Sequence, residues 1–235
     1  QKNFEKIPGS SIGYWLSNSM IELFSKGVLG EKYKAKVGLQ TGDNDRFTRF
    51  FFELNISSTS LINKINYKWI PFNKWGDFKK WYGNRLYMLY WYNNGELLKS
   101  FKQSVIRNQN FYFKESVSCS AITSSKISFR IYPGDGAFDI NFRSFFTNNN
   151  YYLLGFLNSK IAQFFISSLN PTLAFNVGDL EKIPFTVSHI NKISGIVENL
   201  IDISKSDWDS HETSWDFKQN ELIRLKSDTL EESFN

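Results

Sequence analysis

Three side chains suited to contacts with nucleic-acid bases lie in or beside one turn of the sequence. Gln40, Asn44 and Arg46 flank or belong to a turn that begins at Thr41 and continues with Gly42. Their amide and guanidinium groups are those that pair in bidentate fashion with the edges of adenine and guanine. The pattern makes this turn, Thr41 included, a candidate DNA-contacting loop.

Two features of the same turn leave its role open. Gly38 and Gly42 allow another backbone to approach closely, as a ligand-facing loop requires. Asn44 and Asp45, however, are also residues that close turns without contacting any ligand. We expect the loop to contact DNA, and leave open whether it reaches a base edge.

A second group of residues places cations among aromatic side chains. Lysines act at DNA as point charges that position the protein on phosphates without reading sequence. The alternative is an ordinary core of tryptophans with a solvated lysine face. The lysines are Lys74, Lys79 and Lys80, and the aromatic residues are Trp69, Trp75, Trp81 and Tyr82.

Further cations follow in the same part of the chain. Arg107, Lys126 and Arg130 are additional candidates for phosphate contact. The strand pattern predicts that Lys126 and Arg130 share one side of a strand, because alternate residues point the same way. All ten candidates are therefore Gln40, Thr41, Asn44, Arg46, Lys74, Lys79, Lys80, Arg107, Lys126 and Arg130.

Residues for catalysis or metal binding do not form a recognisable pattern. His189 and His211 lie far in sequence from cysteines or carboxylates at metal-ligand spacing. Cys119 lies between serines without a nearby base, and no Gly-x-Ser-x-Gly elbow is present. We expect no catalytic residue and no metal site in this chain.

Charge is segregated along the sequence. Residues 61 to 150 contain 13 Lys and Arg against 5 Asp and Glu, whereas residues 196 to 235 contain 4 against 10. A basic, aromatic-rich body suits a polyanion, because neutralised phosphates release counterions. The acidic run from Asp202 to Asp216 would repel phosphate. We expect it to dock against a parent enzyme or partner, or to be a solvated helical tail.

Composition limits the class of protein. A chain of 235 residues builds one substantial core with a smaller appendage. Its 23 Phe, 11 Tyr and 7 Trp favour half-buried β surfaces over helical bundles. One cysteine and no long apolar run predict a cytoplasmic protein without a membrane segment. The chain starts at Gln1, which suggests a fragment.

Periodicity predicts helices at the ends and strands between them. Helical spacing is expected over 11–26, 151–169, 188–203 and 214–225, with an extended connection over 177–184. A hairpin tip is expected at Asn93-Asn94-Gly95, with its second strand over 96–101. The β-prone runs are 36–39, 47–54, 67–72, 86–91, 111–118, 126–132 and 137–140.

Several strings, taken in order, resemble one family over essentially the whole chain. They are similar to the C-terminal target-recognition region of PglX-like adenine-specific DNA methyltransferases of BREX phage-defence systems, which are type IIG-like. The Thr-Gly-Asp-Asn turn resembles the Thr-Gly-x-Asn motif near the start of such regions. The strings cover 7–17, 38–47, 68–74, 78–84, 106–108, 111–114, 124–130, 153–160, 169–173, 177–179, 207–210 and 212–217.

The resemblance implies a larger enzyme that transfers a methyl group from S-adenosylmethionine to adenine. This chain lacks the Asn-Pro-Pro-aromatic motif that would hold a flipped adenine, and it lacks the Phe-x-Gly-x-Gly cofactor loop. Asn170-Pro171-Thr172-Leu173 has neither the second proline nor the aromatic, and is better explained as a helix-ending turn. We expect no cofactor in this fragment and S-adenosylmethionine in the parent enzyme.

These observations predict an α+β fold with a curved, mainly antiparallel β recognition domain, flanking helices and a C-terminal helical extension. Residues 1–30 are expected to be a linker and opening helix, 31–186 the DNA target-recognition domain, and 187–235 the helical extension. The expected partners are double-stranded DNA, the upstream methyltransferase domain of the same polypeptide and other defence-system proteins. The alternatives are a single-stranded nucleic-acid binder, an aromatic-rich β module such as a carbohydrate binder, and an independent enzyme.

Overall fold

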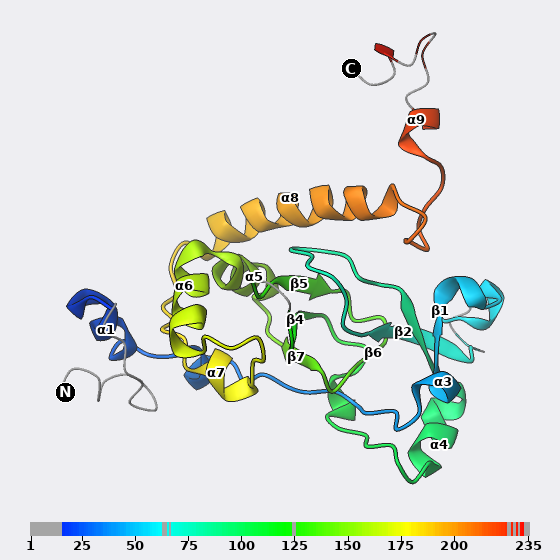
Figure 1. The fold of residues 1–235 in the computed structure, drawn as a ribbon, viewed down its shortest axis with the longest axis horizontal. Coiled ribbons are helices and arrows are strands. Elements are labelled where there is room, and N and C mark those ends of the chain that lie inside the picture. Colours follow the sequence, from blue (N-terminus) through cyan, green and yellow to red (C-terminus); the bar gives the residue numbers. More distant parts are fainter. Residues whose placement is uncertain are drawn as a thin grey trace.

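The computed structural model is described for residues 16–62, 65, 67–123, 126–224, 227, 229, 231 and 232. In Figure 1 a β body lies between helices, with the long helix α8 along one side. The helices are α1 (Asn18–Phe24), α2 (Leu29–Lys32), α3 (Asn44–Phe47), α4 (Tyr92–Ser100), α5 (Asn150–Asn158), α6 (Lys160–Leu169), α7 (Val177–Glu181), α8 (Ile190–Asp209) and α9 (Glu221–Arg224). The strands are β1 (Thr48–Phe50), β2 (Trp69–Asn73), β3 (Tyr87–Tyr90), β4 (Ser116–Ser120), β5 (Phe129–Tyr132), β6 (Ala137–Phe138) and β7 (Phe142–Phe145).

The strands form two small sheets. The first has the order β1-β3-β2-β6, in which only the β2–β6 pair is parallel. The second is antiparallel, in the order β5-β4-β7, with Ser118 opposite both Arg130 and Ser144. The predicted α+β class, with mainly antiparallel sheets and a helical C-terminal part, is confirmed.

Each sheet has its own hydrophobic cluster. The cluster of the first sheet contains Phe47, Phe72, Leu89 and Trp91. The cluster of the second sheet continues into α5, α6 and α8. α5 packs on β4 and β5 and carries α8 on its other side, so that α8 is an outer layer (Figure 1).

Two glycines hold the chain close to the body. A Cβ atom on Gly38 would lie 1.7 Å from the carbonyl oxygen of Phe138. Gly42 has a φ of +75°, and a Cβ atom there would lie 2.6 Å from the backbone of Gln103. The predicted close backbone approach is therefore used within the protein, where it anchors the turn at 41–44.

Several predicted elements were wrong in detail. The hairpin at Asn93-Asn94-Gly95 is not formed: these residues have left-handed φ values of 48°, 56° and 73°, and the chain then turns helical to Ser100. The following Glu96, Leu97 and Lys99 favour helix over strand, and Leu98 is buried on the body.

The predicted helix over 151–169 is two helices. Ser159 adopts an extended backbone with ψ of 154°, and its hydroxyl accepts a hydrogen bond from the Ala162 N–H, which starts α6. The expected extended connection over 177–184 contains the short helix α7. Residues 36–39 form isolated bridges instead of a strand, while β7 was not predicted.

The helices near the two ends of the chain also differ from the predicted ones. α1 occupies part of the predicted 11–26 helix, whose first residues lie outside the described part of the chain. α8 continues six residues past the predicted end at 203, and the 214–225 helix is confined to α9. Within the described residues, no helix is both long and apolar enough to cross a bilayer.

Candidate nucleic-acid interface

The turn at 41–44 is held by a small hydrogen-bond network. The Asn44 Oδ1 atom accepts one bond from the Thr41 hydroxyl at 2.8 Å and one from the Lys74 ammonium at 2.7 Å. The Asp43 carboxylate caps α3 by accepting a bond from the Arg46 N–H at 3.0 Å. The structure thus brings together Thr41, Asn44 and Lys74 from the ten predicted residues.

Lys74 supports this turn from inside the body. It is 4% exposed, and its ammonium group lies 5.7 and 5.6 Å from the ring centroids of Phe72 and Tyr87. Burial lowers the pKa of Lys74, and the nearby Asp139 partly opposes that effect. Lys74 therefore fixes a side chain at the surface instead of forming part of a solvated basic face.

Arg46 and Gln40 remain at the surface. The Arg46 guanidinium lies 5.1 Å from the ring centroids of both Phe47 and Phe101, while the residue stays exposed. The Gln40 backbone pairs with Val105 through two hydrogen bonds of 2.9 Å, which leaves its side chain exposed. Both side chains keep donors free to meet a ligand beside the turn.

A groove runs from the turn across the body. Its largest hollow, about 650 Å³, is lined by Lys80, Lys126 and Lys160. A second hollow of about 400 Å³ shares Phe78, Lys126 and Leu173 with the first and extends to Trp75. Trp75 also lines a third hollow of about 380 Å³, together with Asn44, Arg49 and Lys74. We call these three adjoining hollows, taken together, the groove.

The groove combines cations with exposed aromatic rings. Lys126 and Lys160 are exposed and Lys80 is half-buried. No carboxylate among the described residues lies within ion-pair distance of these three ammonium groups. Trp75 and Phe78 are 56% and 51% exposed, although aromatic residues of this size are usually covered. The acidic residues that line the groove are Asp77, Asp45 and Glu53.

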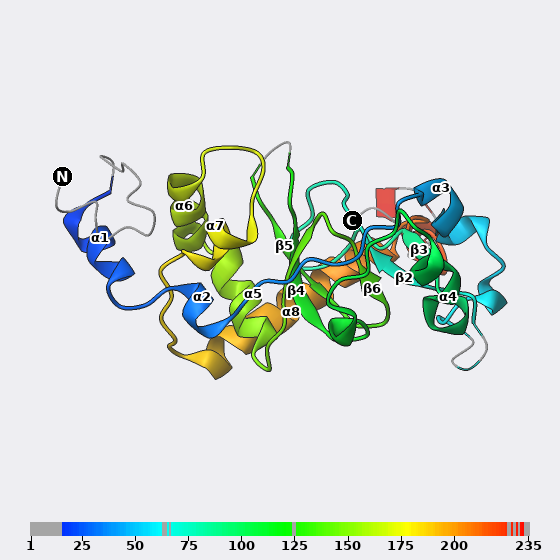
Figure 2. The same ribbon diagram turned by 90° about the horizontal axis from the view of Figure 1, so that it is seen from below.

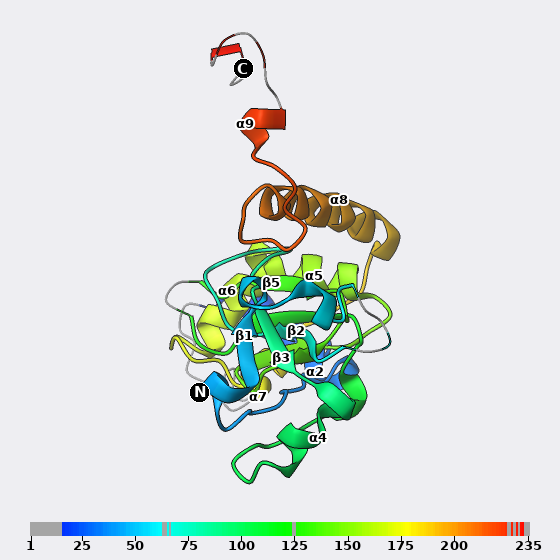
Figure 3. The same cartoon turned by 90° about the vertical axis from the view of Figure 1, so that its right-hand side faces the viewer.

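Segments far apart in the sequence form this surface. In Figure 2 the loop before β3, the loop between α6 and α7, and α3 lie along the upper edge of the molecule. Figure 3 shows the same segments along the left edge, whereas α8 lies above the β body. The groove and α8 therefore occupy different sides of the body.

Lys79 faces the other way from its neighbour Lys80. The Lys79 ammonium lies 3.9 Å from the Asp207 carboxylate and 5.9 Å from the Trp208 ring centroid, both on α8. Lys79 is therefore not part of the groove. Its charge is matched by the acidic helix.

Arg130 and Arg107 are not brought to the groove either. Arg130 is 2% exposed, its guanidinium lies 5.0 Å from the Phe142 ring, and burial lowers its pKa to about 10. It is therefore not available to a phosphate. Lys126 precedes β5 instead of sharing its face with Arg130, and Arg107 is an exposed loop residue away from the three hollows.

The sequence pattern missed one wall of the groove. Lys160, Gln163 and Ser167 on α6 line the largest hollow. Their spacing of three and four residues places them on one polar face of the helix. The spacing lies within the predicted helix over 151–169 and is a signal in the sequence that could have found this wall.

The structure does not fit a bound adenine or methyl donor at Asn170. The Asn170 amide donates to the Ala174 carbonyl and the Asp179 carboxylate, both at 2.8 Å. Its Oδ1 atom accepts from the Thr172 N–H at 2.8 Å and hydroxyl at 2.6 Å. All the amide's bonds are thus used in a turn. Within the described part of the chain, no cluster of His, Cys, Asp or Glu could hold a metal ion.

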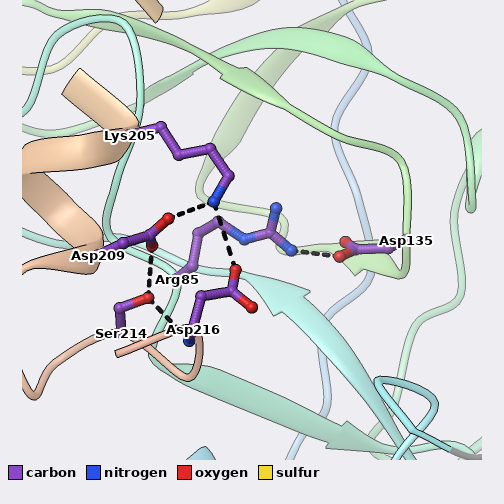
Figure 4. Close-up of polar contacts among 6 residues, drawn as sticks. All are labelled: Arg85, Asp135, Lys205, Asp209, Ser214 and Asp216. Carbon is purple, nitrogen blue, oxygen red and sulfur yellow. Dashed lines mark hydrogen bonds and ion pairs between the residues drawn. The ribbon is translucent and has the colours of Figure 1, made fainter. Parts of the chain in front are cut away.

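The acidic C-terminal segment docks on the body of this chain. Figure 4 shows Lys205 bonded to Asp209 and Asp216, and Asp209 accepting a bond from Ser214. The Trp215 ring lies 4.6 Å from the Arg85 guanidinium, which is buried and paired with Asp135. The segment is therefore not only a solvated tail, since Trp215 packs on the β body of this chain, and its docking against a parent enzyme or partner stays a prediction.

Comparison with known proteins agrees with the family suggested by the motifs. No family model matches the chain. It is 38% identical over 240 residues to "Adenine-specific methyltransferase PglX" of Lacticaseibacillus casei, which covers 95% of this chain and 20% of that protein. It is 37% identical over 233 residues to "Adenine-specific methyltransferase BrxX" of Escherichia coli, covering 96% of this chain and 19% of that protein.

The chain is similar to a segment of PglX-like adenine-specific methyltransferases. It spans about one fifth of the length of these relatives. The predicted resemblance to PglX-like proteins is confirmed, and both the turn and the groove lie within the matched region.

Proposed function

We propose that this chain is the double-stranded DNA recognition module of a PglX-like, S-adenosylmethionine-dependent adenine methyltransferase. The observation that carries the proposal is the groove, in which Lys80, Lys126 and Lys160 form no ion pair with any carboxylate of the described residues. Such cations bind phosphates by releasing counterions. The name of the relatives, which act on adenine, supports DNA as the polyanion.

The turn at 41–44 supplies the second part of the proposal. It lies at the end of the groove, because Asn44 lines the hollow that Trp75 joins to the rest. DNA seated on the groove lysines would bring its base edges toward Asn44, Arg46 and Gln40. Phosphate contacts then set the register, and the turn reads bases. Both parts fall within residues 31–186, the proposed recognition domain.

Binding of a fluorescent duplex, followed by anisotropy between about 50 and 200 mM salt, tests this proposal. The wild-type chain should bind with a steep salt dependence. The triple variant Lys80→Ala, Lys126→Ala and Lys160→Ala should lower the slope of log K against log salt by about 3, since each phosphate contact contributes about 0.9. No affinity for duplex at low salt would refute the function.

A matched control separates the groove from total charge. Lys26, Lys192 and Lys218 are exposed lysines outside the three hollows. Their replacement by alanine removes the same three charges and should leave the slope nearly unchanged. An equal loss in both triple variants would show that binding depends on net charge and not on the groove.

One observation favours a second candidate function. Trp75 and Phe78 expose about half of their surface in the groove, and exposed rings are stacking platforms for the bases of single strands. In that case an unlabelled single strand should displace the duplex, and Trp75→Ala should weaken binding more than loss of the lysines. We expect the duplex to compete better and Trp75→Ala to have the smaller effect.

A further inference from the structure

The side chain of Asn44 is presented in one orientation only. Its Oδ1 atom receives the Thr41 hydroxyl and the Lys74 ammonium. An ammonium group has donors and no acceptor, so the NH₂ group of Asn44 cannot take the Oδ1 position beside Lys74. The amide is therefore oriented by its neighbours, with the oxygen inward.

Both acceptor sites of that oxygen are used. A carbonyl oxygen accepts two hydrogen bonds, and Asn44 Oδ1 already has two, at 2.8 and 2.7 Å. The Asn44 Nδ2 group makes no hydrogen bond to any described residue, and the residue is exposed. Asn44 thus offers the solvent two donors and no acceptor.

This presentation changes what Asn44 can read. Recognition of adenine by asparagine requires an amide oxygen that accepts from the base N6 amine while the amide NH₂ donates to N7. In this structure the oxygen is occupied. Guanine, in contrast, offers only acceptors, O6 and N7, at the same edge of the major groove.

We propose that Asn44 is a specificity-determining residue that selects guanine over adenine, and that Thr41 and Lys74 are its positioning residues. The inference rests on the proposed DNA-binding function and names the base-edge chemistry that the turn recognises. Lys74 then contributes to recognition without contacting a phosphate, since it is 4% exposed.

Selection from a pool of duplexes with a randomised segment, followed by sequencing of the bound fraction, tests the proposal. The wild-type 235-residue chain should enrich sequences with a position at which guanine is preferred to adenine. Asn44→Asp keeps an oxygen for Thr41 and Lys74 but replaces the NH₂ donor. It should reduce the guanine preference at that position roughly five- to hundredfold, the range of one base contact.

Three further variants test how Asn44 is positioned. Gln103→Glu adds the same charge beside the turn, because Gln103 lies against Gly42 and is exposed. This variant should bind all duplex sequences more weakly to the same extent, and should keep the preference for guanine over adenine. Thr41→Val removes one of the two hydrogen bonds that hold the Asn44 oxygen inward, so the amide can turn its oxygen outward and the preference for guanine over adenine should fall, whereas Thr41→Ser keeps the hydroxyl and should retain the wild-type preference. Far-UV circular dichroism confirms that each variant is folded.

The outcomes distinguish this inference from the function on which it rests. A wild-type chain that binds no duplex refutes both. A chain that binds duplex, but whose base preferences are the same in Asn44→Asp and Gln103→Glu, refutes the reading role and leaves the DNA-binding function intact. A preference for adenine that depends on Asn44 refutes the donor-only presentation.

Discussion

The groove and the side of the body under α8 hold positive charge in different ways. In the groove, Lys80, Lys126 and Lys160 face solvent without an acidic partner among the described residues. On the α8 side, Lys79 pairs with Asp207, and Lys205 pairs with Asp209 and Asp216. The acidic C-terminal segment neutralises one side and leaves the other free.

Burial makes the contrast stronger in the interior. Arg85 and Arg130 are 7% and 2% exposed. Asp135 offsets part of the cost of desolvation for Arg85, whereas Arg130 has the Phe142 ring beside it and, among the described residues, no hydrogen-bond partner for its Nε and Nη2 atoms. A cation in such a position stabilises or strains the fold but does not bind a ligand. The basic middle of the sequence is thus divided into a binding part and a structural part, and the two parts respond differently to chemical change.

The largest expected effect concerns the interior beside Arg130. Burial raises the pKa of the Cys119 thiol to about 12, with Arg143 and Arg130 partly opposing it. The thiolate is the reactive form, so at pH 8 its fraction falls roughly a thousandfold relative to a thiol with a pKa of 9.0. Cys119 should not react with iodoacetamide in the native state, and should react once urea unfolds the chain.

Mass spectrometry of the alkylated chain measures this reaction. Modification in native buffer at the rate of a free thiol would show that solvent reaches the interior, and Arg130 would then also be open to a ligand. Arg130 could then no longer be assigned to the structural cations of the interior.

The next effect is on stability, through Arg85. Arg85→Ala leaves Asp135 without its partner and removes the cation beneath Trp215. Breaking a fully buried pair by removing one member costs about 3–5 kcal/mol, and the expected loss lies at the lower end of that range because the Asp135 side chain is 32% exposed. Urea unfolding should show a loss of that order, and adding Asp135→Asn should recover part of it.

Lys126→Ala is the matched control for Arg85→Ala, because Lys126 is an exposed cation of the groove. We expect its free energy of unfolding to stay within about 0.5 kcal/mol of the wild type. Equal losses in the two variants would contradict the separation of structural and binding cations.

The smallest effect compares two adjacent lysines. Lys80→Ala should weaken duplex binding roughly fivefold at 0.1 M salt and lower the salt slope by about 0.9. Lys79→Ala should leave both nearly unchanged, since that ammonium faces Asp207 on α8. Anisotropy titrations of the two single variants with duplex DNA measure both the affinity and the salt slope. A larger loss for Lys79→Ala would mean that DNA approaches from the α8 side.

Local chemistry in the sequence predicted some elements well and others poorly. The Thr41-Gly42-Asp43-Asn44 turn was predicted from its residues, because a positive φ at Gly42 and a capping Asp43 are local requirements. The Asn93-Asn94-Gly95 turn was also located, but the hairpin was wrong. A turn does not specify whether a strand or a helix follows it, and the packing of Leu98 decided that here.

The candidate site was predicted only in part for a related reason. The composition located the basic stretch, yet it did not distinguish Lys79 from Lys80, which are adjacent in sequence and face different sides of the body. Lys160, which completes the groove, lies eighty residues from Lys80 and was placed beside it only by the packing of α6. Arg130 looked like a surface cation, but it is buried although β5 is an edge strand, because the segment at Trp81 pairs with the outer side of β5.

The sequence by itself determined the family resemblance, the α+β class, the turn at 41–44 and the segregation of charge along the chain, because these depend on residue type and near neighbours. Only the tertiary structure decided which cations face solvent, which carboxylates cover the others, and that Asn44 points its donors outward. Those properties arise from contacts between distant segments, such as Lys74 with Asn44 and α8 with Lys79. Desolvation and hydrogen-bond saturation depend on all atoms around a group, and the linear order of residues does not contain them.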